Sequence, residues 1–195
     1  MTESTADPST SRHDVVEREK ERFGGVKVGC AFFGWLTATG MTVLLTALVA
    51  AAGAGVGLVS SASQVADAAG ANAEEIGWAG VVLVLAVVLV AYYSGGYVAG
   101  RMARFDGLRQ GLAVFAWAVV AAVVVAVLGA VAGAKYDVLD ELNSFPRFPG
   151  DLSDLSLAAV VTLLGVVVAA LVGSVLGGLA GMAFHRRVDR TGLGR

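Results

Sequence analysis

Residues 155–184 read LSLAAVVTLLGVVVAALVGSVLGGLAGMAF and contain no Asp, Glu, Lys, Arg or His. Three further stretches, residues 28–66, 76–100 and 110–134, are equally free of charge and histidine. A helix needs about 20 apolar residues to cross the hydrocarbon core of a bilayer, and each stretch is longer than that. The sequence therefore predicts an all-α polytopic membrane protein, a bundle of four transmembrane helices at about residues 28–55, 77–101, 108–134 and 156–184.

The composition agrees, because 56% of the residues are hydrophobic and 15% are charged, whereas roughly a quarter of a soluble domain is charged. We expect a cytoplasmic N-terminal tail at residues 1–26, disordered over 1–11 and forming a charged juxtamembrane helix over 12–26. The transmembrane domain is expected at residues 27–184, and a basic cytoplasmic C-terminal tail at 185–195. The remaining polar segments are too short for a separate catalytic domain.

The basic residues predict the orientation. Twelve of the fourteen Lys and Arg fall in residues 12–27, 101–109 and 186–195, whereas the two connections on the opposite side hold only Lys135 and Arg147. By the positive-inside rule, both termini are expected in the cytoplasm. We expect basic side chains at this face to contact anionic lipid headgroups or a protein partner, with these candidates: Arg22, Lys27, Arg101, Arg104, Arg109, Arg186 and Arg187.

The chain resembles itself at a shift of 82 residues. Residues 22–35 (RFGGVKVGCAFFGW) and 104–117 (RFDGLRQGLAVFAW) share seven of fourteen positions, among them the pair Trp35 and Trp117. The pattern predicts two tandem helical-hairpin repeats. Because each unit crosses the membrane twice, the copies would be related by a pseudo-twofold axis along the membrane normal.

Glycines at four-residue spacing predict how the helices pack. Lipid tails are as apolar as Leu, so membrane helices associate through small residues that let their backbones approach closely. The chain has 26 Gly, and the fourth helix carries a continuous glycine face, a glycine zipper. The faces fit packing within the bundle, an oligomer interface or, more rarely, a pore, and the candidate helix-packing residues are Gly96, Gly100, Gly129, Gly133, Gly173, Gly177 and Gly181.

The cytoplasmic connection between the second and third helices contains Asp106 and Gly107, which favour a tight turn and an N-cap for the third helix. Catalytic, cofactor-binding and metal-binding residues are not expected. No Asp, Glu, Lys, Arg or His lies within the four charge-free stretches, and such residues usually mark proton and ion pathways. The histidines, His13 and His185, flank the membrane domain, and Cys30 is the sole cysteine.

Three segments carry a resemblance to a known group: VEREKERFGG at residues 16–25, FGWLTA at 33–38, and residues 92–107, which include GGYVAGRMARFDG. The chain resembles uncharacterised four-helix membrane proteins of actinobacteria, which are similar in layout to YrzE-like small membrane proteins. The resemblance covers roughly residues 14–184. It implies a multi-pass protein of the bacterial plasma membrane and assigns neither an activity nor any functional residue.

These observations favour a non-enzymatic membrane scaffold or interaction protein. The expected partners are the lipid bilayer with its anionic headgroups, and a second copy of the chain or another membrane protein; no nucleic acid and no cofactor is expected. The alternative is a small permease or channel for an uncharged solute, which would use the glycine faces of the second and fourth helices.

Overall fold

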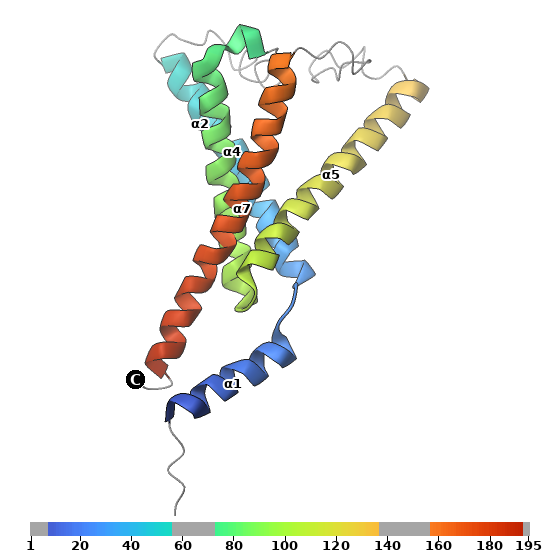
Figure 1. The fold of residues 1–195 in the computed structure, drawn as a ribbon. Helices are drawn as coiled ribbons and strands as arrows, with labels where there is room; N and C mark the ends of the chain where they lie inside the picture. The colour runs from blue at the N-terminus through green and yellow to red at the C-terminus, as the bar shows by residue number, and fades with distance from the viewer. Residues whose placement is uncertain (1–7, 56–72, 137–156, 193–195) are drawn as a thin grey trace, which may run out of the picture.

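Each of the four charge-free stretches contributes one long helix in the computed structural model, which describes residues 8–55, 73–136 and 157–192 (Figure 1). The described helices are α1 (Pro8–Phe23), α2 (Val28–Gly55), α4 (Ala73–Ala103), α5 (Gly107–Tyr136) and α7 (Leu157–Gly192). Four of them contain a segment long and apolar enough to cross a membrane: Val28–Ala52, Gly80–Ala103, Gly107–Val131 and Ala159–Val188. The predicted all-α architecture with four long apolar helices is confirmed.

The helices extend beyond the predicted crossings. α1 begins at Pro8, so residues 8–11 are helical where disorder was predicted; residues 1–7 lie outside the described part of the chain. Proline suits the first position of a helix, because the N–H that it lacks would have no helical partner there. α7 likewise continues to Gly192, through most of the predicted C-terminal tail. Hydropathy marks where a helix leaves the lipid, whereas its backbone hydrogen bonds can continue into water.

Helices α4 and α7 form the central pair of the bundle. α2 packs against α4, and α5 packs against α7, with further contacts of α5 to α4 and α2. In Figure 1, α1 and the described end of α7 lie at the same end of the bundle as the turn from α4 to α5. α5 diverges from α7 with distance from this end, so the described helices pack most closely there.

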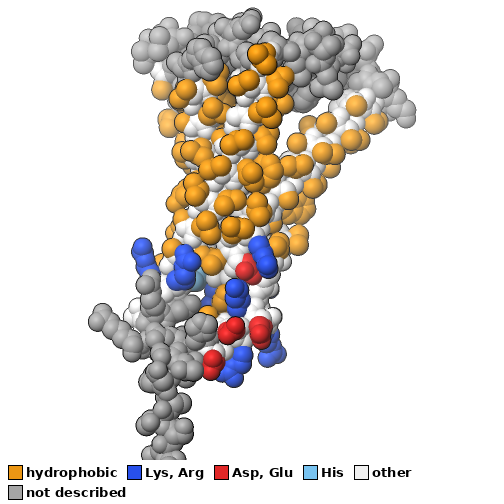
Figure 2. Space-filling view, viewed as in Figure 1, with side chains coloured by type: hydrophobic (Ala, Val, Ile, Leu, Met, Phe, Trp, Pro, Cys, Tyr) orange, Lys and Arg blue, Asp and Glu red, His pale blue; other side chains and the backbone are white. Residues whose placement is uncertain are grey.

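Small residues form the core and large apolar residues cover the surface. Ala31, Ala38, Ala91 and Ala99 are buried, whereas Leu44 is 65% exposed and many other Leu and Val side chains are similarly accessible. Figure 2 shows these apolar side chains along the visible length of the long helices, and charged side chains gathered at one end. Exposed apolar area on this scale is unfavourable in water, but lipid is a suitable solvent for it.

The helices approach one another through glycines. A Cβ added at Gly34 of α2 would lie 2.6 Å from the Gly95 carbonyl oxygen of α4, and one at Gly96 would collide with the Ser174 backbone of α7. A Cβ at Gly111 of α5 would lie 2.7 Å from the Val175 Cα. Real Cβ atoms do not approach other atoms so closely. Only glycine at these positions therefore lets the backbones of adjacent helices come into direct contact.

Five of the seven glycines that the sequence singled out lie in the α4–α7 contact: Gly96, Gly100, Gly173, Gly177 and Gly181. Gly129 differs, because a Cβ at this position would meet no atom within 4 Å. It lies in the part of α5 that diverges from the bundle, so its spacing from Gly133 does not give it a neighbour within the described chain. Gly133 is helical, and its surroundings lie outside the described residues.

Hydroxyl groups on α2 and α7 bond to the backbone of their own helices. Each donates to a carbonyl oxygen three or four residues earlier, at 2.9–3.1 Å, and the examples are Thr37, Thr39, Thr42 and Ser174. These side chains are satisfied without a partner from another helix.

Candidate functional site

The charged end of the bundle comprises α1, the connection at residues 24–27, the turn at residues 104–106 and the last turns of α7 from Met182 onward. Charged side chains of the described residues gather here (Figure 2). Polar contacts between segments about 80 residues apart in the sequence also occur here. Within the described chain, this end therefore offers the charged and polar groups that could bind a lipid headgroup or a protein partner.

The turn from α4 to α5 is tight and left-handed. Arg104 has φ 60° and Asp106 has φ 57°, a conformation that costs a side-chain-bearing residue energy, although Asp tolerates it better than most. The Phe105 N–H donates to the Ala103 carbonyl (2.7 Å), and the Asp106 carbonyl accepts the Gln110 N–H (2.9 Å). Asp106 thus occupies the N-cap position of α5, as the sequence predicted.

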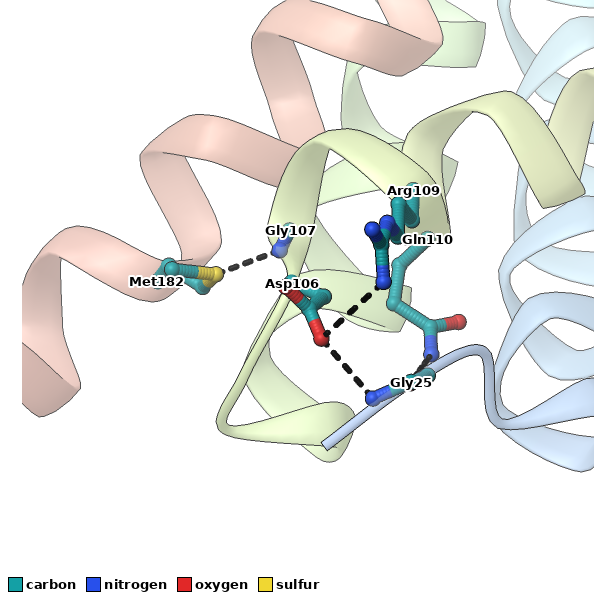
Figure 3. A network of polar contacts seen from close by, with 6 residues as sticks. All are labelled: Gly25, Asp106, Gly107, Arg109, Gln110 and Met182. Atoms are coloured by element: carbon teal, nitrogen blue, oxygen red, sulfur yellow. Dashed lines mark hydrogen bonds and ion pairs between the residues drawn. The ribbon is translucent and has the colours of Figure 1, made fainter. Parts of the chain in front are cut away.

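The Asp106 carboxylate reaches across to the connection between α1 and α2 (Figure 3). Its Oδ2 accepts a hydrogen bond from the Gly25 N–H at 2.8 Å and lies 3.9 Å from Arg109 Nη1. Gly25 has φ +90°, which favours glycine, and a Cβ at Gly24 would collide with the Lys20 carbonyl. Asp106 therefore fixes the point at which the chain turns from α1 into α2.

Gln110 makes a second contact with the same connection. Its side chain is fully buried, and its Nε2 lies 3.4 Å from the Gly25 carbonyl oxygen. With the amide turned, the nitrogen donates to the Lys27 carbonyl (3.3 Å) and the oxygen accepts the Lys27 N–H, so both groups are satisfied. Sequence reasoning missed Gln110. The available signal was that it is the only Asn or Gln within the four predicted helices.

α7 holds the other side of the turn. The Gly107 N–H donates to Met182 Sδ, which satisfies a free donor at the start of α5 (Figure 3). The His185 Nε2 lies 2.8 Å from the Arg101 carbonyl oxygen, near the end of α4. The ends of α4, α5 and α7 are thus joined by side-chain contacts to backbone groups that their own helices leave free.

The predicted basic residues surround this junction. Arg104 pairs with Glu19 of α1 at 2.9 Å, and the Arg101 guanidinium stacks on the Phe184 ring, with Cζ 3.8 Å from its centroid. Arg101 Nη1 is buried and has no hydrogen-bond partner among the described residues. The other candidates are exposed: Arg22, Lys27, Arg109, Arg186 and Arg187.

Aromatic residues close the contact between α2 and α5. Trp35 and Trp117 stack with their ring centroids 6.4 Å apart, and Phe32 meets Trp117 edge to face at 5.3 Å. Both tryptophans pack against the buried cluster of Ala31, Ala99 and Val114. The two tryptophans that the 82-residue shift aligns are therefore direct neighbours.

Within the described ranges, no three His, Cys, Asp or Glu side chains gather closely enough to hold a metal ion. The expected absence of catalytic, cofactor and metal sites remains a prediction.

The fold and its exposed apolar helices define an integral membrane protein with four candidate spans, in contact with the lipid bilayer. Comparisons with models of protein families, with curated proteins and with solved structures gave no match. The resemblance to the actinobacterial and YrzE-like membrane proteins therefore stays a prediction.

Proposed function

We propose that this protein is a non-enzymatic membrane scaffold that holds α1 in a fixed position beside the bilayer for a protein partner. The contacts of Asp106 and Gln110 with the α1–α2 connection carry the proposal. α1 is strongly charged, and Glu17, Arg18, Lys20 and Glu21 are exposed on it. A charged helix with its end fixed to a membrane bundle offers a partner a preorganised surface, which lowers the entropic cost of binding.

Close helix packing favours the scaffold over the permease alternative. The glycine faces assigned to a solute path lie against each other, with Gly96 on the Ser174 backbone and Gly177 on the backbone of Tyr93 and Tyr97. A solute would need α4 and α7 to separate in order to pass between them. Such a separation would remove the central contact of the bundle.

A photocrosslinking residue at Glu21 of the full chain, activated in native membranes, tests the scaffold. We expect a crosslinked protein of defined mass. Asp106→Ala should reduce its yield several-fold, because Ala tolerates φ 57° poorly and offers no acceptor to the Gly25 N–H. Asp106→Asn keeps a side-chain acceptor and should have a smaller effect. Glu19→Gln removes the half-exposed ion pair with Arg104, worth about 0–1 kcal/mol, and should have the smallest effect of the three.

Capture of lipid alone at Glu21 and at further exposed α1 positions would contradict the scaffold. The permease makes a separate prediction, which is passage of glycerol or urea into liposomes that contain the purified protein. Flux of either solute above that of protein-free liposomes would support the alternative.

We also propose that the protein spans the bacterial plasma membrane with both termini in the cytoplasm. The asymmetry of Lys and Arg supports this orientation, as does the position of α1 and the end of α7 at one end of the bundle. A reporter that is active only in the cytoplasm should be active when it is fused after Arg195. Activity of a reporter that works only outside the cell would contradict the orientation.

We infer further that the two hairpins are copies of one unit. Three pairings support this inference: α4 packs on α7, α2 packs on α5, and Trp35 stacks on Trp117. A pseudo-twofold axis would bring such equivalent elements together. Superposition of the two hairpins in a cryo-electron microscopy structure of the protein in lipid nanodiscs tests the inference, and hairpins with different crossing geometry would contradict it.

A further inference from the structure

An apolar groove lies between the start of α2 and the first half of α5. It has a volume of about 200 Å³, and its lining includes Val28 and Ala31 of α2 and Ala113, Ala116, Trp117 and Val120 of α5. Val28 and Val120 are 62% and 51% exposed, so the groove opens at the surface of the bundle. Its position within two candidate spans makes hydrocarbon its natural content.

Two cations stand one helical turn before the groove. The Ala31 N–H donates to the Lys27 carbonyl at 3.0 Å, which places Lys27 one turn before Ala31. Arg109, Ala113, Ala116 and Val120 follow one another at spacings of four, three and four, and so form one stripe along α5. Ala116 lies roughly 10 Å along the helix from Arg109 at 1.5 Å per residue.

Both cationic side chains are accessible at the same junction. Gln110, next to Arg109 in the chain, contacts the Lys27 backbone, so the two basic residues flank one contact between α2 and α5. Lys27 is exposed, and the Arg109 side chain is 65% exposed. The 3.9 Å approach to Asp106 leaves most of the five guanidinium donors of Arg109 free for a phosphate.

We propose that this groove binds one anionic phospholipid, with its phosphate between Lys27 and Arg109 and an acyl chain along Ala113, Ala116 and Trp117. The two cations lie nearer the charged end of the bundle, and the apolar groove follows them toward the membrane interior. A phospholipid in the leaflet at that end has the same order, with its phosphate outside and its acyl chains inside. Basic pockets between membrane helices bind anionic headgroups in this way. The site does not depend on the scaffold role, because a bundle without any protein partner would bind the same lipid.

Native mass spectrometry of the purified full chain in mild detergent tests the site. The protein is titrated with phosphatidylglycerol or with phosphatidylcholine of identical chains. We expect tighter retention of the first phosphatidylglycerol. Lys27→Gln combined with Arg109→Gln should weaken its apparent affinity roughly twentyfold, from the usual contribution of two surface cations. Arg18→Gln with Lys20→Gln, at exposed positions of α1, removes the same charge at the same end and should change it less than about threefold.

The apolar half of the site is tested by a second pair of substitutions, one inside the groove and one outside it. Ala116 is exposed in the groove, so Ala116→Phe should fill the groove and reduce retention of phosphatidylglycerol, whereas Ala122→Phe, at an exposed position further along α5, should not. Equal retention of the two lipids by the wild-type protein would overturn the proposal. Equal losses in both charge pairs, or full retention by Ala116→Phe, would also overturn it.

Discussion

Gly177→Leu is expected to prevent assembly of the α4–α7 pair. A Cβ at Gly177 would lie 2.7 Å from the Tyr97 backbone nitrogen and closer still to the Tyr93 carbonyl oxygen. These are backbone atoms, which cannot rotate away as a side-chain end can, so the helices must separate. Overpacking of a core typically costs about 1–3 kcal/mol, and we expect a loss of about 3 kcal/mol or more here. The measurement is thermal unfolding of the detergent-purified protein, together with its elution as a single species.

Gly129→Leu is the matched control. It makes the same substitution in another long apolar helix, but at a position where an added Cβ meets no atom within 4 Å. It should leave the thermal midpoint unchanged or raise it slightly, because Leu has the higher helix propensity. Equal destabilisation by the two substitutions would show that backbone contact at Gly177 is not what holds α4 to α7. Destabilisation by Gly129→Leu alone would place the critical glycine contact elsewhere, at a subunit interface of α5.

The number and position of the long helices could be predicted because a charged side chain in lipid costs much free energy wherever it occurs in a crossing. Each membrane helix is therefore visible in the sequence as a stretch without charged residues. A run such as residues 110–134, free of ionisable groups, has few alternatives to a membrane helix. The ends of the helices could not be predicted equally well. α7 continues past His185 to Gly192, because backbone hydrogen bonding, rather than hydropathy, determines where a helix ends.

The glycine contacts show what spacing alone leaves open. Gly96 and Gly129 each lie four residues before another glycine, yet only Gly96 meets a neighbouring helix in the described chain. The difference arises from the divergence of α5, which depends on the packing of all four helices. Likewise, the sequence placed Asp106 in a turn, but its bond to Gly25 depends on the approach of two segments 81 residues apart.

Gln110→Met is expected to loosen the connection between α1 and α2. Met has a similar length but cannot accept a hydrogen bond from the Lys27 N–H, which Gln110 satisfies from a fully buried position. The Lys27 carbonyl keeps its bond from the Ala31 N–H. A buried backbone group left without its partner costs about 1–3 kcal/mol. We expect a loss of stability in this range and faster hydrogen exchange in the peptide that covers residues 24–31, both measurable on the detergent-purified protein.

Ser174→Ala separates the role of Gln110 from the general effect of removing a buried polar group. Ser174 is also fully buried, but its hydroxyl donates to the Leu171 carbonyl of its own helix at 3.0 Å. That carbonyl also belongs to the backbone ladder of α7, so loss of the hydroxyl should cost little and leave exchange over residues 24–31 unchanged. If Gln110→Met and Ser174→Ala had the same effect on this peptide, the side chain of Gln110 would not be what fixes the connection. α1 would then depend on Asp106 for its position. In that case Asp106→Ala alone should speed hydrogen exchange over residues 24–31.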